Sequence, residues 1–296
     1  MKIQPGCHRC IEHQLKLLSN EIGKGDASRM SLILNELLAI YSGVVDSASP
    51  PELAALYYEY FERKTGISDP FRREKKYSTE LALRLLPELR KLVDEAGEGA
   101  FERAMLFAIG GNIIDYGVNP DFDIGTAERQ ILQVLDYEYD RDAAAELRCR
   151  MDGARSIMYI MDNCGEAVID RLLIERYSDK ITVVVRGRPI LNDVTRDDAV
   201  ASGLDFVPII DNGDGAPGVS LRRSSSEFLR QLRATDLVIA KGQGNFEAMG
   251  DEFHDRPAFY LLRTKCDVIC GQLGAKLNSI QIIGRNLRNV PEHPVR

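Results

Sequence analysis

The sequence predicts an α/β protein in which a helical N-terminal domain packs on a doubly wound, mostly parallel, Rossmann-like sheet with helices on both faces. Before residue 153, apolar residues recur at three- and four-residue spacing, as in amphipathic helices. After residue 153, short β-branched runs alternate with helical segments, as in βαβ units. These runs are almost continuously apolar, which is typical of strands buried on both faces. We therefore expect a mainly α-helical domain at 1–152 that contributes to a cleft, and an α/β domain at 153–296 that carries the site.

The first domain is expected to consist of helices. Helical periodicity extends over residues 10–23, 28–45, 51–66, 78–97, 99–117 and 124–137. The fourth of these segments begins at a Ser-Thr pair suited to helix capping and ends at Gly97. Its internal Pro87 is expected to kink it. No strand is predicted before about residue 156.

The second domain is expected to contain parallel strands at residues 156–161, 181–186, 205–210, 236–240 and 258–262. Helical segments at 165–179, 195–203, 224–234, 244–252 and 264–274 separate and follow them. If the strands are ordered 3-2-1-4-5, the loops after the first and fourth strands face each other, where open α/β sheets bind ligands. The longest loop, 211–226, is a candidate rim of that site.

Composition and charge disfavour several classes of partner. The net charge of -7 disfavours a broad nucleic-acid surface, because phosphate backbones attract clustered Lys and Arg. No apolar run reaches the roughly 18 residues that a membrane span requires, and the N-terminus lacks the apolar core of a signal peptide. We therefore expect a cytoplasmic protein that binds neither nucleic acid nor membranes. The oligomeric state has no signature in the sequence.

The six cysteines are too sparse for a disulfide scaffold in a chain of 296 residues. The spacing Cys7-x-x-Cys10 is the one that resembles half of a zinc site, and Cys266 and Cys270 are the candidates for the other half. Ordinary free thiols and a redox pair are the alternatives. The sequence does not decide whether Cys7 and Cys10 bind a metal.

Carboxylates follow two neighbouring predicted strands. Asp162, beside Asn163, follows the first strand, and Asp193 follows the second. Carboxylate and amide oxygens suit hard cations such as Mg²⁺ or Mn²⁺, and oxygen-rich sites also hold Co²⁺ or Ni²⁺. The structural alternative is that these residues only cap the helices that follow them.

The fourth strand leads into the segment Lys241-Gly-Gln-Gly-Asn245. Lys241 provides a point charge for a phosphate, and Gly242 and Gly244 allow backbone N–H groups to approach an anion at a helix start. A cation, a lysine and a helix N-terminus at one crevice indicate phosphoryl chemistry. The structural alternative is a tight turn. The segment is not a dinucleotide-binding fingerprint, because the third glycine is missing.

Several blocks of this sequence resemble the signatures of the damage-control phosphatases, also called domain-of-unknown-function family 89. The blocks are "DNCGE", "RGRPILNDVTRDDA" and "KGQGNFEAM", preceded by "SDPFRREKK" at 68–76, "AIGGNIIDYGV" at 108–118 and the Cys-x-x-Cys pair. They cover nearly the whole chain, in the order that the family shows. The layout is similar to that of the stand-alone archaeal and bacterial-type members. Cys164 replaces an alanine that is common in the first block.

The resemblance implies a metal-dependent phosphatase acting on small phosphorylated metabolites, such as damaged or surplus sugar phosphates or cofactor intermediates. It implies a divalent cation, Mg²⁺, Mn²⁺, Co²⁺ or Ni²⁺, held by Asp162, Asn163 and Asp193. The residues expected to bind the phosphate of the substrate are Lys241, Gly242, Gly244 and Asn245. The residues expected to be catalytic are Asp162 and Lys241, together with Asn112 and Asp115 from the helical domain.

Two questions stay open at this point. The nucleophile is either a metal-activated water or Asp162 itself, through an aspartyl-phosphate. The alternative functions are an S-adenosylmethionine-dependent methyltransferase, because doubly wound sheets also bind that cofactor, and a non-catalytic protein that binds a metal or metabolite. A methyltransferase favours a glycine-rich turn after the first strand, and "DNCGE" has one glycine. Two carboxylates beside a lysine favour phosphatase chemistry over simple binding.

Overall fold

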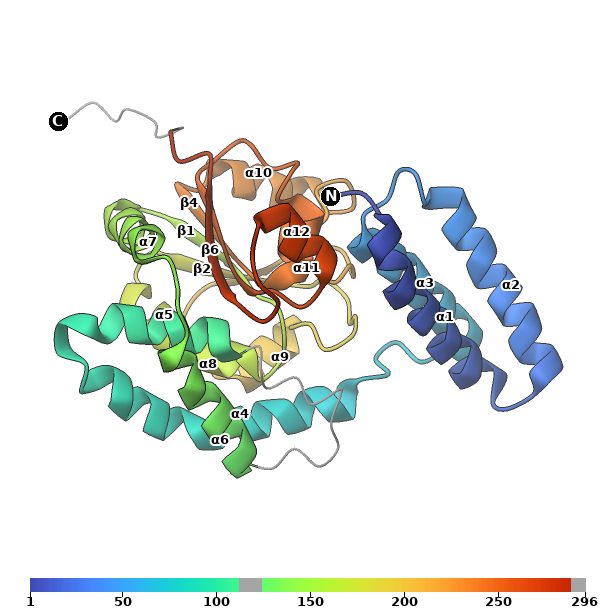
Figure 1. Ribbon diagram of the computed structural model, residues 1–296, viewed down its shortest axis with the longest axis horizontal. Coiled ribbons are helices and arrows are strands. Elements are labelled where there is room, and N and C mark those ends of the chain that lie inside the picture. Colours follow the sequence, from blue (N-terminus) through green and yellow to red (C-terminus); the bar gives the residue numbers. More distant parts are fainter. Residues whose placement is uncertain (112–123, 289–296) are drawn as a thin grey trace.

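A six-stranded sheet with helices on both faces forms the centre of the molecule (Figure 1). The computed structural model describes residues 1–111 and 124–288. The strand order is β3-β2-β1-β4-β5-β6; β1 to β5 are parallel, and β6 is antiparallel to β5. The strands are β1 (Ile157–Ile160), β2 (Ile181–Val185), β3 (Ile209–Asp211), β4 (Leu237–Lys241), β5 (Ala258–Arg263) and β6 (Ile280–Arg285). The predicted fold class and the order of the first five strands are confirmed, whereas β6 was not predicted.

The helices of the second half connect the strands and cover both faces of the sheet. They are α8 (Glu166–Ile174), α9 (Arg196–Ala201), α10 (Ser226–Ala234), α11 (Gly242–Met249) and α12 (Asp267–Leu273). The helices of the first half are α1 (His8–Gly23), α2 (Ala27–Val44), α3 (Pro50–Thr65), α4 (Arg72–Asp94), α5 (Ala100–Gly110), α6 (Ile124–Leu132) and α7 (Arg141–Gly153). None of these described helices is long and apolar enough to cross a membrane.

Alternate residues of the central strands contribute to two separate cores. Tyr159 of β1 and Ile239 of β4 pack into a large core with α4, α5, α7 and α8. Ile160 and Ala240, one position later in the same strands, pack into a second core with α10, α11 and α12. Since side chains alternate across a strand, the face toward which each strand residue points follows from its position.

The helices before residue 153 form two groups. Helices α1, α2 and α3 lie together at one side of the molecule around their own apolar core (Figure 1). Helices α4 to α7 instead share the large core with the sheet. Helix α3 also contacts α11, so the first group touches the α/β part. The division at residue 152 stays a prediction.

Helix α4 begins at Arg72, six residues before the predicted start at Ser78, and it continues through Pro87 to Asp94. The first turns of α4 lie in the charged segment "RREKK", which shows no apolar periodicity. Lys75 in these turns is buried, because it pairs with Asp69 at 3.1 Å and with Asp198 at 2.6 Å. Its charge is therefore compensated inside the protein.

Candidate active site

The loops after β1 and β2 run side by side at the carboxyl edge of the sheet. Asn163 and Asp193 form an isolated antiparallel bridge. The amide of Val194 donates to the carbonyl of Asp162 at 3.0 Å, and the amide of Cys164 donates to the carbonyl of Asn192 at 2.8 Å. This backbone pairing brings the three predicted metal ligands, Asp162, Asn163 and Asp193, into one cluster, although the strands that carry them are 20 residues apart in sequence.

The helix-capping alternative does not account for these residues. Gly165, with φ of +81°, is the N-cap of α8, and no side chain caps that helix. Thr195 precedes α9, and its hydroxyl donates to Asp198 at 2.6 Å. The side-chain amide of Asn163 instead donates to Asp162 Oδ2 at 2.8 Å.

Arg186, which is not among the predicted site residues, lies beneath this cluster. Its side chain is 1% exposed. Nε donates to Asp193 Oδ2 at 2.7 Å, and one Nη donates to the carbonyl of Met161 and to Asn245 Oδ1, each at 3.2 Å. Arg186 therefore links the segments that follow β1, β2 and β4, and it holds Asp193 in place.

Lys241 is also buried, with no exposed surface. Its ammonium donates to Glu166 Oε1 at 2.5 Å, to Asp170 Oδ1 at 2.6 Å and to the carbonyl of Ala108 at 2.8 Å. An ammonium has three N–H donors, and protein oxygens accept all three. The structure therefore argues against the predicted contact between Lys241 and phosphate.

The buried groups carry more negative than positive charge. Four buried carboxylates, called the acidic cluster below, surround two buried cations. The carboxylates are Asp162, Glu166, Asp170 and Asp193, and the cations are Arg186 and Lys241. If all six groups are ionised, two negative charges are left uncompensated. Burial, followed by the charges of Glu166 and Asp193, raises the pKa of Asp162 well above its ordinary value. Burial also raises the pKa of Asp193 to about 6, against the opposing effect of Arg186.

This excess of charge fits a divalent cation, which would balance it. The donors nearest to the carboxyl edge are Asp162, Asn163 and Asp193, all oxygen donors of the kind that hard cations take. Within residues 1–111 and 124–288, no three His, Cys, Asp or Glu side chains are arranged to hold a metal. The predicted set differs from such a group, because its third ligand is the amide oxygen of Asn163.

The segment after β4 packs tightly on the acidic cluster. Gly242 has φ of +79°, and a Cβ there would lie 1.9 Å from Asp162 Oδ2. A Cβ on Gly244 would lie 2.4 Å from the carbonyl oxygen of Pro217. Gly242 therefore supports Asp162, while Gly244 is covered by the 212–225 loop.

Asn245 is buried, and both polar atoms of its side chain form hydrogen bonds with protein groups. Its Nδ2 donates to the carbonyls of Met161 and Lys241, and its Oδ1 accepts from Arg186 and from the amide of Val219. The structure thus argues against the predicted contacts of Gly244 and Asn245 with phosphate. Asn245 instead ties the 212–225 loop to the ends of β1 and β4.

Lys265 lies at the same edge of the sheet, two residues after β5. Its side chain is exposed, and its charge acts to lower the pKa of Asp162. The side chain of Gln243 accepts from the amide of Lys265 at 3.0 Å, which fixes this loop against α11. The sequence contains a signal for Lys265, because this residue follows the fifth predicted strand.

Asn112 and Asp115 lie outside the described residues. The chain up to Gly111 nevertheless reaches the cluster, since a Cβ on Gly111 would lie 3.3 Å from Cα and Cγ of Glu166. The catalytic role of Asn112 and Asp115 stays a prediction.

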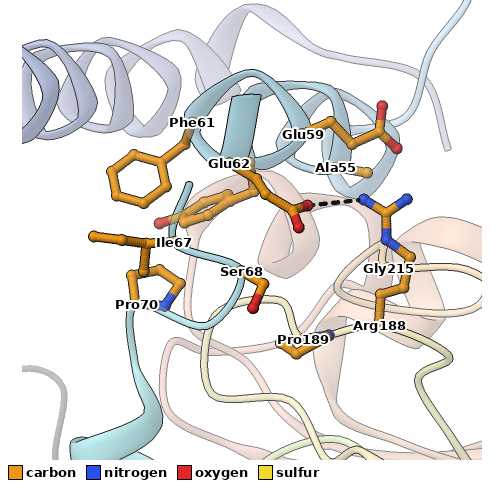
Figure 2. A pocket seen from close by; sticks show the side chains of 11 residues that line it. Ala55, Glu59, Phe61, Glu62, Ile67, Ser68, Pro70, Arg188, Pro189 and Gly215 are labelled. Atoms are coloured by element: carbon orange, nitrogen blue, oxygen red, sulfur yellow. Dashed lines mark hydrogen bonds and ion pairs between the residues drawn. The ribbon is translucent and has the colours of Figure 1, made fainter. Parts of the chain in front are cut away.

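A narrow pocket lies beside the loop that carries Asp193 (Figure 2). Helix α3, the 67–70 loop and the loops after β2 and β3 line it, and Arg188 pairs with Glu62 across it at 3.3 Å. Its cavity volume of about 10 Å³ accommodates about one water molecule. None of the acidic-cluster residues lines this pocket, so the cluster, and not the pocket, is the candidate active site.

Comparisons with known proteins identify the family to which the chain belongs. The model of the damage-control phosphatase ARMT1-like domain matches residues 3–280. A protein of Methanocaldococcus jannaschii described as uncharacterized is 30% identical, covering 96% of each chain. A damage-control phosphatase of Archaeoglobus fulgidus is 29% identical, covering 95% of this chain and 98% of its own. A damage-control phosphatase of Pyrococcus horikoshii is 31% identical, covering 92% of this chain and 94% of its own. The crystal structure of a DUF89 family protein from Pyrococcus horikoshii superposes with a TM-score of 0.80 at 28% identity, covering 97% of this chain and 99% of that chain. Matched over nearly its whole length in sequence and in fold, the chain belongs to the damage-control phosphatase family.

Proposed function

We propose that the protein is a metal-dependent phosphatase that hydrolyses small phosphorylated metabolites. The observation that carries this proposal is the convergence of Asp162, Asn163 and Asp193 at the carboxyl edge of the sheet, in a cluster with surplus negative charge. Membership of the damage-control phosphatase family supports it. The substrate class, damaged or surplus sugar phosphates or cofactor intermediates, is part of the proposal.

Each group has a specific task in this proposal. A bound divalent cation supplies charge stabilisation for the phosphoryl group and the leaving oxygen. Asp162, Asn163 and Asp193 hold that cation, and Arg186 orients Asp193. The exposed Lys265 replaces Lys241 as the residue that binds phosphoryl oxygens, because an ammonium at the rim can reach a ligand and a buried one cannot.

We propose water as the nucleophile. Asp162 Oδ2 accepts a hydrogen bond from Asn163 and lies against Gly242. A carboxylate that holds a cation and accepts a hydrogen bond on its second oxygen is a weak nucleophile. Direct attack by Asp162 is therefore the less favoured route.

The two alternative functions lack a comparable observation. The loop after β1 carries Asp162 and Asn163, and a methyltransferase favours a glycine-rich turn at that place. A non-catalytic binder needs no cation site beside an exposed lysine at the rim of the sheet.

Phosphate release separates these possibilities. The metal-stripped protein is incubated with a panel of phosphorylated metabolites and Mg²⁺, Mn²⁺, Co²⁺ or Ni²⁺, and inorganic phosphate is measured. Metal-dependent release from at least one sugar phosphate or cofactor intermediate is expected. No release with any ion, together with binding of S-adenosylmethionine, would instead support the methyltransferase.

The Cys7 and Cys10 thiols are expected to be dispensable for the chemistry. They lie where the N-terminal segment meets α12, as the close packing of Gly6 on Val268 shows. The cation donors proposed above are all oxygens. The variant with Cys7→Ser and Cys10→Ser should therefore retain wild-type turnover at saturating Mn²⁺, even if its unfolding midpoint falls. A normally folded double variant without turnover would contradict this expectation.

A further inference from the structure

Lys241 joins three elements that converge under the acidic cluster. It is the last residue of β4, Glu166 and Asp170 belong to α8, and Ala108 belongs to α5. All three contacts of its ammonium are between 2.5 and 2.8 Å. A second group completes the arrangement, since the hydroxyl of Tyr159 donates to Asp170 Oδ1 at 2.9 Å.

A continuous chain of hydrogen bonds leads from Lys241 to the proposed cation ligands. Lys241 contacts Glu166 Oε1, and the other oxygen of this carboxylate accepts from the side chain of Asn163 at 3.3 Å. The same Asn163 amide donates to Asp162 Oδ2 at 2.8 Å. Because the amide nitrogen of Asn163 faces these two carboxylates, its oxygen is directed away from them.

The contact with Ala108 extends this chain to α5. Gly111, at the end of α5, packs on Glu166 so closely that a Cβ would lie 3.3 Å from its Cγ. Ala104 and Ala108 of α5 and Ala167 of α8 are fully buried in one core. Movement of the Lys241 ammonium would therefore disturb both Glu166 and the end of α5.

We propose that Lys241 is a positioning residue that acts through Glu166 to orient Asn163 and Asp162 toward the cation, and that it does not contact the substrate. The inference rests on the proposed function, because it assumes a cation at these ligands. It assigns Lys241 a different role from the one expected from its sequence motif, in which the ammonium binds phosphate.

Whether Lys241→Met binds the cation more weakly or more tightly than the wild type separates the positioning role from the phosphate-binding role. Removing a buried positive charge near a cation site would by itself strengthen cation binding. Weaker binding in Lys241→Met therefore has to come from lost orientation of the ligands. Loss of a residue that orients a metal ligand typically lowers metal affinity by roughly tenfold to a hundredfold, and we expect a change of that size.

Calorimetric titration measures this directly. Mn²⁺ is titrated into the metal-stripped wild type and into Lys241→Met, and inorganic phosphate is then titrated at saturating Mn²⁺. Glu166→Gln is the second variant, which keeps the side-chain volume and the Lys241–Asp170 pair but cannot accept from both Lys241 and Asn163. Both variants should bind Mn²⁺ more weakly, and phosphate affinity should stay close to that of the wild type.

Lys75→Met is the matched control. Lys75 is also buried and is also paired with two carboxylates, Asp69 and Asp198, neither of which is a proposed cation ligand. It should lose stability as Lys241→Met does, with a much smaller change in Mn²⁺ affinity. An equal loss in both lysine variants would show a general structural effect and overturn the inference.

The remaining outcomes are equally informative. Wild-type or tighter Mn²⁺ binding in Lys241→Met, with weakened phosphate binding, would restore the phosphate role. If Lys241→Met does not fold, unchanged Mn²⁺ binding in Glu166→Gln overturns the inference. If wild type and variants bind Mn²⁺ equally, the inference fails and the proposed function stands. If the wild type binds no Mn²⁺, both fail.

Discussion

Replacing Asp162 with alanine is expected to abolish metal-dependent phosphate release while the protein stays folded. The variant loses one of the three proposed cation donors, and turnover should fall by about a thousandfold, at the upper end of the losses seen when a charge-stabilising contact is removed. Folding should be preserved, because burial beside Glu166 and Asp193 raises the pKa of Asp162 and the substitution relieves that repulsion. Phosphate release and the chemical unfolding midpoint are measured on the same preparation.

Asp193 requires a different substitution for the same test. Asp193→Ala would leave Arg186 buried without its carboxylate, at a cost of about 3–5 kcal/mol. Asp193→Asn keeps an oxygen to accept from Arg186 and removes the charge that the cation needs. Asp211→Ala is the control, since Asp211 ends β3 at the same edge but is exposed and pairs with Arg196. Full activity in Asp162→Ala or Asp193→Asn would remove that residue from the proposed site.

Gly242→Ala is expected to eliminate cation binding through Asp162. A Cβ at this position would lie 1.9 Å from Oδ2 and 2.2 Å from Cγ of Asp162, so the carboxylate has to move. The affinity for Mn²⁺ should fall by at least about a hundredfold, at the upper end of the effects of displaced metal ligands. Titration of Mn²⁺ into the metal-stripped variant measures the change.

Gly274→Ala separates this clash from backbone strain. Gly274 has a similar positive φ of +63°, and a Cβ there meets nothing within 4 Å. The left-handed conformation costs an alanine about 1–2 kcal/mol, so this control should lose some stability and keep wild-type Mn²⁺ affinity. Equal Mn²⁺ affinity in Gly242→Ala and the wild type would show that Asp162 does not need its observed position.

The sheet was the most predictable part of the fold. The parallel strands β1, β2, β4 and β5 have buried, β-branched or aromatic runs with helical segments between them, and their pattern is visible over a few residues. The antiparallel β6, "IQIIGR", includes polar and glycine positions and lies half-exposed at the edge of the sheet, so its apolar signal is weak. Helix α7 contains mainly charged and alanine residues, which give little periodicity.

The location of the site could be predicted, but the direction of each side chain was harder to predict. Asp162, Asn163 and Asp193 follow directly from the rule that ligands bind at the carboxyl ends of parallel strands. The direction of the Lys241 side chain follows from the alternation of side chains along β4. Lys241 lies two and four residues after Ile239 and Leu237, so it points to the same face of the sheet as they do, into the core with α5 and α8. Its side chain therefore points under the cluster, where Glu166 and Asp170 supply the charges that it needs.

Arg186 illustrates the opposite case. It follows the apolar run of β2 and has the parity of Val184, which faces α10 and α11. Its partners Asp193 and Asn245 are 7 and 59 residues away in sequence. Only the spatial order of the strands brings them together, and a single sequence gives no pairwise signal for such a contact.

Phosphate release by the metal-stripped wild-type protein, before and after addition of Mn²⁺, tests the central claim most directly. A phosphorylated sugar from the substrate panel is the reporter, with Asp162→Ala assayed in parallel. The account predicts no release without metal, release after Mn²⁺ is added to the wild type, and none from Asp162→Ala under the same conditions. Equal release with and without metal, or from both proteins, would contradict a cation site at Asp162, Asn163 and Asp193.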